Sequence, residues 1–420
     1  MSDIGRPSRR DFLKSSTVAA AGVALAGGLS MARSAHAAGP DQIKVALIGC
    51  GGRGTGAAAN CLNAPDNIKI VAVADAFEDR ARGAANSLKN NPKADIAEDR
   101  IFIGFDAYQK AIDCGVDMVI LATPPGFRPI HYAAAIKAGK HVFMEKPCCT
   151  DAAGFRSLME TNKLADEKGL KVGVGLQRHH EASYLEGIKQ IQGGSLGDIL
   201  FLRAYWNGGP IWIRRREEGD TEMRYQMRNW YHFTWLGGDN ICEQHVHNLD
   251  VCNWVMNDHP VEANGMGGCE VRDNRGVGQI FDHHAVEFTY ANGTKMFSQC
   301  RQIPGCSDNV SEAAHGTKGS SGCTARARGS NPYDQEHVDL IKAIRDNAKY
   351  NEGWYGATSS MTAVLGRMAT YSGKVVKWDD AVAKGPSLMP EKFAWDATPP
   401  VVPDEKGVYP MAVPGVYKPY

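Results

Sequence analysis

A run of glycines directly behind a short apolar segment constrains the fold of this chain more than any other feature. Ile43–Ile48 reads as a buried strand, Gly49-Cys50-Gly51-Gly52-Arg53-Gly54 follows it, and an Ala-rich helix is predicted over Thr55–Asn63. In this setting glycines let the backbone approach a pyrophosphate at a helix N-terminus. The pattern therefore predicts a dinucleotide-binding Rossmann domain. The residues expected around the phosphates are Gly49, Gly51, Gly52, Arg53 and Gly54.

An acidic residue follows at the distance that this kind of site requires. The second apolar segment, Ile68–Ala74, ends in Asp75, where a carboxylate can bind the adenosine ribose. Because that carboxylate would repel a 2′-phosphate, Asp75 favours NAD over NADP, although Arg53 could offset part of the repulsion. A glycine-rich turn without any ligand is the alternative interpretation.

The strand and helix patterns change character near the middle of the chain. Up to about residue 176, short apolar segments alternate with helical patterns, which is typical of a parallel sheet. Beyond it the strands become longer, and Asn292-Gly293 separates Ala285–Tyr290 from Lys295–Cys300, a strong hairpin signal. We expect an α/β protein with an N-terminal, doubly wound parallel Rossmann sheet. A C-terminal mixed α/β domain with a largely antiparallel sheet should follow.

The length of 420 residues, with 43% hydrophobic and 22% charged residues, fits two globular domains. We expect the Rossmann domain over residues 42–176 and a substrate and oligomerisation domain over residues 177–385, whose last helices could pack back on the Rossmann domain. A Pro-rich tail over residues 386–420 shows little periodicity and is expected to be an extended arm. The segment Arg214–Tyr231, rich in arginine and aromatic residues, is expected either at the pocket mouth or at a subunit contact.

The first 37 residues read as a twin-arginine signal peptide. Arg9-Arg10 precedes an Ala- and Gly-rich stretch over Ser15–Ala32, and Ala35-His36-Ala37 is a small-x-small cleavage site. This predicts export by the twin-arginine machinery, to the periplasm or an equivalent compartment. No later segment is long and apolar enough to suggest a membrane span.

Composition disfavours several other classes of function. The 47 basic and 47 acidic residues balance, so nucleic acid is not an expected partner. The 11 cysteines form no C-x-x-C pair and are expected to be mostly buried free thiols, with a Cys300 to Cys306 disulfide left open. The histidine pairs His179/His180, His245/His247 and His283/His284 match no metal-ligand spacing, and we expect no metal.

Two further motifs give the chain a family resemblance. Ala122-Thr123-Pro124-Pro125 follows one predicted strand, and Glu145-Lys146-Pro147 follows the next, His141–Met144. In this order, behind the glycine fingerprint, they make the chain resemble the glucose-fructose oxidoreductase and inositol dehydrogenase family (Gfo/Idh/MocA) over about residues 43 to 380. The resemblance implies cofactor contacts from Thr123, Pro124, Glu145 and Lys146. It also implies that Lys146 reaches the substrate hydroxyl.

The resemblance extends to a second motif in the C-terminal half. The family pattern G-G-G-x-x-x-D-x-x-x-H has its counterpart in residues 237–247, where His247 matches but Glu243 replaces the aspartate. One helix would place Glu243 and His247 on a common face. We expect His247 to act as the base, with help from Lys146, and Glu243 to contact substrate rather than orient His247. A purely structural histidine is the alternative.

Residues for substrate binding are less strongly indicated. By resemblance Arg178 is a candidate substrate contact. Trp206, Asn207 and Trp212 combine aromatic rings with an amide, which suits stacking on a sugar ring and bonding its hydroxyls. Core packing explains these residues equally well.

The motifs together predict an NAD(H)-dependent oxidoreductase that acts on a sugar or polyol hydroxyl. Export implies that the cofactor travels bound, because little free NAD exists outside the cytoplasm, and this favours a closed cycle in which the hydride is returned at the same site. An NAD-using glycoside hydrolase of the same family and a non-catalytic sugar-binding protein are the alternatives. By resemblance, we expect a homo-oligomer.

Overall fold

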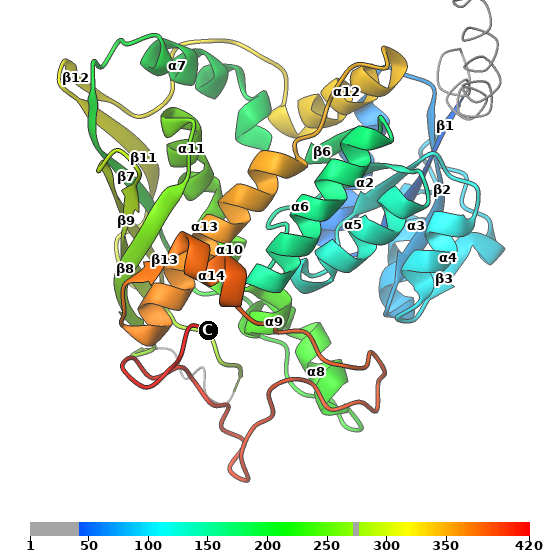
Figure 1. The fold of residues 1–420 in the computed structure, drawn as a ribbon. Helices are drawn as coiled ribbons and strands as arrows, with labels where there is room; N and C mark the ends of the chain where they lie inside the picture. Colours follow the sequence, from blue (N-terminus) through cyan, green and yellow to red (C-terminus); the bar gives the residue numbers. More distant parts are fainter. Residues whose placement is uncertain (1–41, 272–276) are drawn as a thin grey trace, which may run out of the picture.

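A parallel six-stranded sheet forms the N-terminal half of the computed structural model, which describes residues 42–271 and 277–420 (Figure 1). The predicted leader over residues 1–37 lies outside the described residues. The strand order is β3-β2-β1-β4-β5-β6. The strands are β1 (Ile43–Ile48), β2 (Ile68–Asp75), β3 (Ile101–Ile103), β4 (Met118–Leu121), β5 (His141–Met144) and β6 (Val172–Val174). The order reverses direction between β1 and β4, and in such sheets ligands bind at the carboxyl ends of the strands on either side of that point.

Helices cover both faces of this sheet. They are α2 (Gly52–Asn63), α3 (Glu78–Leu88), α4 (Ala107–Asp113), α5 (Arg128–Lys137) and α6 (Ala152–Glu167). Along β1, Val45 and Leu47 belong to one apolar cluster and Ala46 and Ile48 to another, so side chains on both faces are buried. This double burial explains why the strand is an uninterrupted apolar run in the sequence.

A seven-stranded mixed sheet forms the C-terminal half, with the order β12-β11-β7-β10-β9-β8-β13. Its strands are β7 (Ile199–Gly208), β8 (Pro260–Gly268), β9 (His283–Tyr290), β10 (Lys295–Gln302), β11 (Asn309–Gly316), β12 (Gly319–Ser321) and β13 (Val376–Lys377). All neighbours are antiparallel except β7 and β10. The predicted hairpin is confirmed as β9 and β10, with Phe288 opposite Met296. The predicted fold class is confirmed.

The helices of the C-terminal half connect the two sheets. The long helices α11 (Val246–Met256) and α13 (Gly353–Ser372) pack against one face of the mixed sheet, and α13 also contacts α6. Helix α12 (Pro332–Arg345) packs on α2, where Leu340 and Ile344 enter an apolar cluster of the Rossmann sheet. Helices α7 (Ala182–Gln192) and α14 (Trp378–Lys384) also belong to this half.

Short helices and the C-terminal arm complete the fold on the side of the Rossmann strand ends. Three short helices follow β7, namely α8 (Glu222–Arg228), α9 (Thr234–Gly237) and α10 (Asn240–Glu243). Residues 386–420 contain neither helix nor strand and loop around α8 before returning to the end of α13 (Figure 1). The arm is bound to the rest of the molecule by hydrogen bonds, such as those from Gln226 to the Val401 carbonyl and from the Gly415 N–H to the Ser372 carbonyl.

All eleven cysteines lie in the described residues, and they form no disulfide with one another there. Cys300 is buried and Cys306 is exposed, so the disulfide left open by the sequence does not form in this structure. None of the helices in residues 42–271 and 277–420 combines the length and hydropathy needed to cross a membrane.

Candidate active site

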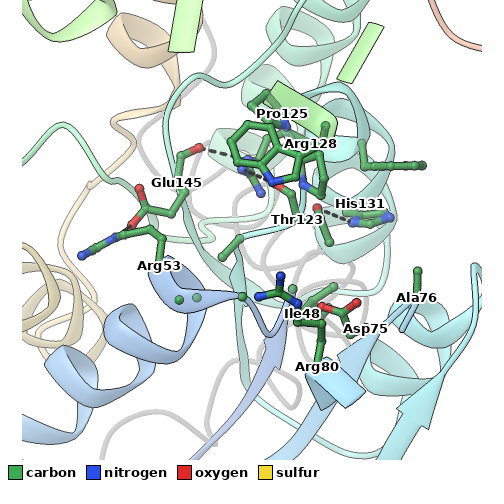
Figure 2. A pocket seen from close by; sticks show the side chains of 18 of the residues that line it. Ile48, Arg53, Asp75, Ala76, Arg80, Thr123, Pro125, Arg128, His131 and Glu145 are labelled. Carbon is green, nitrogen blue, oxygen red and sulfur yellow. Dashed lines mark hydrogen bonds and ion pairs between the residues drawn. The ribbon is translucent and has the colours of Figure 1, made fainter. Parts of the chain in front are cut away.

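A cavity of about 670 Å³ lies at the carboxyl ends of β1 and β4, between the two halves of the molecule. Figure 2 shows Asp75 and Arg80 at one end of this cavity and Arg53 and Glu145 at another. Every residue that the sequence assigned to the cofactor lines it. These residues are Gly49, Gly51, Gly52, Arg53, Gly54, Asp75, Thr123, Pro124, Glu145 and Lys146.

The glycine turn has the geometry of a phosphate cradle. Gly49 has a φ of +98°, and a Cβ there would lie 2.3 Å from the backbone nitrogen of Thr123. A Cβ on Gly54 would lie 1.9 Å from the carbonyl oxygen of Gly49, so both positions require glycine for the turn itself. Gly52, at the N-terminus of α2, instead faces open space. Backbone N–H groups at a helix start, with room in front of them, fit a dinucleotide pyrophosphate.

Asp75 is fixed at the rim of the cavity by two backbone bonds. Its carboxylate accepts hydrogen bonds from the N–H of Cys50 at 2.7 Å and of Phe77 at 2.9 Å. Burial raises the pKa of Asp75, and these two bonds and the charge of Arg80 act in the opposite direction. This arrangement suits a ribose hydroxyl. The cation beside Asp75 is Arg80 of α3 and not Arg53, which corrects the expectation from the sequence.

Arg53 is paired with two other carboxylates, those of Glu145 and Glu336, and not with Asp75. Its Nε lies 2.5 Å from Glu145 and its Nη2 lies 3.4 Å from Glu336 of α12. Glu336 is buried, and burial together with the charge of Glu145 raises its pKa. Arg53, in the first turn of α2, therefore links the cofactor cradle to α12, the helix of the C-terminal half that packs on α2.

Arg128 is a buried cavity residue that no sequence pattern indicated. Its Nε donates to the carbonyl of Glu145 at 2.9 Å and its Nη2 to the carbonyl of Thr123 at 2.8 Å, so it ties together two predicted cofactor segments (Figure 2). Burial lowers its pKa to about 10. Its Nη1 has no hydrogen-bond partner within the described residues. A buried, orphaned N–H group at the cavity wall fits an acceptor on a bound ligand.

Lys146 and Glu243 meet across the two halves of the molecule. The ammonium of Lys146 donates to the Glu243 carboxylate at 3.0 Å and also to the Glu243 carbonyl. Both side chains line the cavity and are mostly buried. Glu243 is thus placed to orient Lys146, a role that the sequence did not assign to it.

His247 lines the same cavity and is held as a neutral imidazole. Burial, reinforced by the positive charges of Lys146, Arg178 and Arg53, keeps the pKa of His247 well below its ordinary value. Its ring stacks on Trp206 at 6.0 Å, and its Nδ1 has no hydrogen-bond partner in the part of the chain that the structure describes. A neutral imidazole with a free nitrogen can accept a proton.

The expectation that one helix carries Glu243 and His247 is wrong. Helix α10 ends at Glu243, and α11 begins at Val246. The N–H of His247 bonds the carbonyl of Gln244 in the turn between them, and both side chains still reach the cavity. Glu243 and His247 therefore lie on two separate helices.

Comparison with known proteins agrees with this geometry. Residues 43–176 match a family model described as an oxidoreductase family with an NAD-binding Rossmann fold, Gfo/Idh/MocA. The match covers the Rossmann domain and agrees with the resemblance that the sequence motifs carry. NAD is the cofactor that this family description specifies, in agreement with Asp75. Residues 6–26 match a twin-arginine translocation signal, which confirms the predicted export signal and its route.

Several inositol dehydrogenases are similar to this chain. An inositol 2-dehydrogenase of Klebsiella pneumoniae is 27% identical over 217 residues, which cover 52% of this chain and 55% of that protein. One of Azotobacter vinelandii is 25% identical over 385 residues, covering 84% of this chain and 99% of that protein. The Lactobacillus casei scyllo-inositol dehydrogenase structure with NAD(H) and scyllo-inositol aligns with a TM-score of 0.62 at 18% identity, covering 81% of this chain and all of that one. The matched part is only about half the length of the Klebsiella relative, and the structural likeness shows a shared fold.

Beside the Gfo/Idh/MocA motifs, the cavity has an aromatic wall. The predicted residues Trp206 and Trp212 both line it, and so do Trp230 and Arg214, which the sequence did not single out individually. All but Trp206 belong to residues 209–232, which we call the insert. The predicted segment Arg214–Tyr231 falls within the insert and reaches the pocket through residues such as Arg214 and Trp230.

Arg178 and Asn207, also predicted as substrate contacts, are not among the residues that line the cavity. Arg178 forms an ion pair with the buried Glu312, which also accepts a bond from Tyr184 at 3.0 Å. Asn207 is buried in β7. Asp250, on α11, accepts a bond from His179 at 2.8 Å and so orients that histidine.

The histidine pairs do not assemble into a common ligand set. His245 bonds Ser298 at 2.8 Å and His284 bonds Thr370 at 2.9 Å. Within residues 42–271 and 277–420, no three His, Cys, Asp or Glu side chains gather in a way that could hold a metal ion.

Proposed function

We propose that this chain is an exported, NAD-dependent oxidoreductase that transfers a hydride between the nicotinamide and a ring hydroxyl of a cyclic polyol or sugar. One observation carries the proposal: Lys146 and His247, from different halves of the molecule, line the same cavity as the glycine fingerprint. The inositol dehydrogenases among its relatives support the class of substrate. The aromatic wall of Trp206, Trp212 and Trp230 supports a ring-shaped substrate.

The cavity residues divide into those that would hold NAD and those that would act on the hydroxyl. The glycine turn would receive the pyrophosphate, Asp75 the adenosine ribose, and Thr123, Pro124 and Glu145 the nicotinamide half. When bound, the nicotinamide supplies the hydride acceptor for the carbon that bears the hydroxyl.

Removal of the hydroxyl proton falls to the residues of this chain. Because the pKa of His247 is held well below its ordinary value, the imidazole is unprotonated at neutral pH and can take that proton. Lys146 donates hydrogen bonds, which would stabilise the oxygen as negative charge develops on it. Glu243 holds the Lys146 ammonium in place at 3.0 Å. In the reverse direction the same groups return the proton to a ketone.

The expected homo-oligomer is part of this proposal. The face of the mixed sheet opposite α11 and α13 carries Phe201, Tyr205 and Phe297, and no described helix covers it (Figure 1). Phe297 is 42% exposed and packs edge-to-face with Phe201. An aromatic sheet surface of this kind suits contact with a second copy.

The test begins with protein purified without added nucleotide. Denaturation should release NAD or NADH, identified by chromatography, and native protein mixed with cyclic polyols should gain the near-ultraviolet absorbance of NADH. Lys146→Met should abolish this gain while cofactor remains bound. A Lys146→Met protein with unchanged turnover would overturn the role proposed for Lys146, whereas wild-type protein that binds polyols without ever forming NADH would favour a binding protein.

Glycosides carrying a chromogenic aglycone discriminate the remaining alternative. Release of the aglycone without net NADH formation would assign the chain to the hydrolytic branch. Oxidation of a free polyol to a ketone, without bond cleavage, is the outcome that we expect.

A further inference from the structure

The charged side chains that line the cavity are unequal in number. In the part of the chain that the structure describes, three of them, Asp75, Glu145 and Glu243, are carboxylates. Six are cationic, namely Arg53, Arg80, Arg128, Lys146, Arg214 and Arg228. The lining histidines His131 and His247 add no charge, because burial holds the pKa of each well below its ordinary value. The cavity therefore carries an excess of positive charge, which a bound ligand can balance.

Five of the six cations already have a partner or a place at the cofactor. Three are paired with carboxylates of the protein, namely Arg53 with Glu145, Lys146 with Glu243 and Arg228 with Asp79. A fourth, Arg128, is bonded to two backbone carbonyls. The fifth, Arg80, stands beside the glycine turn, since its Nη1 lies 3.8 Å from the position of a Cβ on Gly51. Arg80 and the start of α2 would therefore bind the pyrophosphate, and Arg214 is left over.

Arg214 has no carboxylate partner within residues 42–271 and 277–420. Its guanidinium lies 5.5 Å from the ring centre of Trp212, and Asn229 fixes its backbone at 2.8 and 3.1 Å. By contrast, Arg216 of the same insert is paired with Glu222 at 2.7 Å. An arginine whose backbone is held and whose charge is not balanced by the protein can pair with an anionic group on a ligand.

The rings around Arg214 suit a sugar-sized ligand. Trp212 meets Trp230 edge to face at 6.1 Å, and both line the cavity beside Arg214. Trp206, on the same wall, stacks on the ring of His247, the proposed base. Aromatic rings bind the apolar face of a sugar or cyclitol, and the guanidinium among them fits a charged substituent on that ring.

We propose that Arg214 selects substrates that carry an anionic group, so that this protein acts on a sugar or cyclic polyol with a carboxylate or phosphate substituent. The inference rests on the proposed function, because it assumes that a ring hydroxyl is oxidised in this cavity. It narrows the class of substrate from polyols in general to sugar acids and sugar phosphates. The anionic group is bound and not transformed, so the chemistry proposed above is unchanged.

Matched sugars with and without the charge test this inference. D-glucuronate and glucose 6-phosphate are compared with glucose, and the galactose series is tested in the same way. Calorimetry on protein loaded with NAD gives each Kd, and NADH absorbance gives kcat/KM. We expect a carboxylate or a phosphate to bind about tenfold more tightly than its neutral counterpart, the size of a charge-assisted bond at a partly exposed site. High salt should shrink this preference. Equal or weaker binding of every anion would overturn the inference.

Arg214→Gln should raise the Kd of the preferred anion about tenfold and change that of the neutral sugar by less than about twofold. Arg215→Gln is the matched control, because Arg215 is the next residue and is also exposed, but does not line the cavity. The control should keep the preference for the anion. An Arg214→Gln protein that keeps this preference but binds NADH more weakly would assign Arg214 to the cofactor phosphates and overturn the inference. Circular dichroism of both variants establishes that the fold is retained.

The outcomes separate this inference from the proposed function. Oxidation of neutral and anionic sugars with equal kcat/KM overturns the role of Arg214 and leaves the function standing. Anion binding that is lost in Arg214→Gln, in a protein that never forms NADH, contradicts the proposed oxidation and supports selection by charge. The preferred member of the panel also identifies the anionic group, since glucuronate and glucose 6-phosphate share the ring and differ in that group.

Discussion

The floor and the cover of the cavity are built in opposite ways. The floor is regular: parallel strands end in a glycine turn and in Asp75, and the backbone supplies most of the predicted contacts to the cofactor. The cover is the insert, which the arm supports from behind through bonds such as that from Gln226 to the Val401 carbonyl. Insert and arm contain only the short helix α8, a 3-10 turn and irregular backbone. Buried side chains hold this backbone in place. His232 bonds the carbonyl of Trp212 at 2.9 Å, and Asn229 bonds both backbone groups of Arg214.

This difference separates the part of the site that any Rossmann enzyme can share from the part that is specific to this chain. Backbone contacts in the floor can be shared by any Rossmann enzyme, because they depend on strand order and on glycine. The cover depends on side chains such as Trp212, Trp230 and Arg228, which can change without disturbing either sheet. We infer that the floor positions the cofactor and that the cover determines which substrate enters.

The largest expected effect tests whether chemistry needs both halves. His247→Asn, in the C-terminal half, should lower kcat by about 10²–10⁴-fold, because the base that takes the hydroxyl proton is lost. Steady-state rates across pH, with cofactor retention measured in parallel, check this. Since the pKa of His247 is held well below its ordinary value, wild-type oxidation should not lose this base between pH 7 and pH 6. A variant with full activity would show that His247 is a structural histidine and that the floor alone performs the reaction.

A second effect tests the junction between the halves. His180 lies where the chain leaves the Rossmann sheet, with its ring nitrogens 2.7 Å from Asp339 and 3.1 Å from Glu352. Burial alone would lower its pKa, but the two carboxylates raise it to about 10. A raised pKa in the folded state gives stability that is complete below the unfolded value near 6.5 and is lost as pH rises toward 10.

Denaturant unfolding at pH 7 and pH 9 measures this contribution. The free energy of unfolding of the wild type should fall by about 1.4 kcal/mol per pH unit more than that of His180→Gln. His259→Gln, at a histidine stacked on Trp378, is the control and should follow the wild type. Equal slopes in wild type and His180→Gln would show that the junction is not held by this charge.

The difference between floor and cover also explains which site residues could be predicted from the sequence. The sequence pointed to the glycines and Asp75 because they lie at a strand end and its turn, and to Lys146 through the family resemblance. Arg128 could not, because its role comes from the carbonyls of Thr123 and Glu145, which meet only in the folded sheet. The break between α10 and α11 could not be predicted either, because no clear sequence pattern marks it. The arm showed only a lack of periodicity in the sequence. Its Trp395 packs against the ring of Phe77, which lies far away in the sequence.

The smallest expected effect tests the cover by itself. Asn229 is fully buried, and its amide accepts from the Arg214 N–H at 2.8 Å and donates to the Arg214 carbonyl at 3.1 Å. Asn229→Ala should loosen Trp212 and Arg214 and raise KM for the substrate about tenfold, the size expected for the loss of one or two hydrogen bonds. The cofactor should stay bound, because the floor is untouched.

Asn253→Ala is the matched control for that change. Asn253 is also buried and bonded through its amide, to Tyr290 and Thr362, but these partners do not line the cavity, whereas Arg214, the partner of Asn229, does. Both variants should lose a similar amount of stability, and only Asn229→Ala should change KM. A change in kcat with KM unaltered would mean that the insert acts on the reacting groups, so that chemistry and substrate choice are not divided between floor and cover. Because the two variants lose equivalent side chains, any difference in KM between them reports the position of the insert and not the general cost of removing a buried amide.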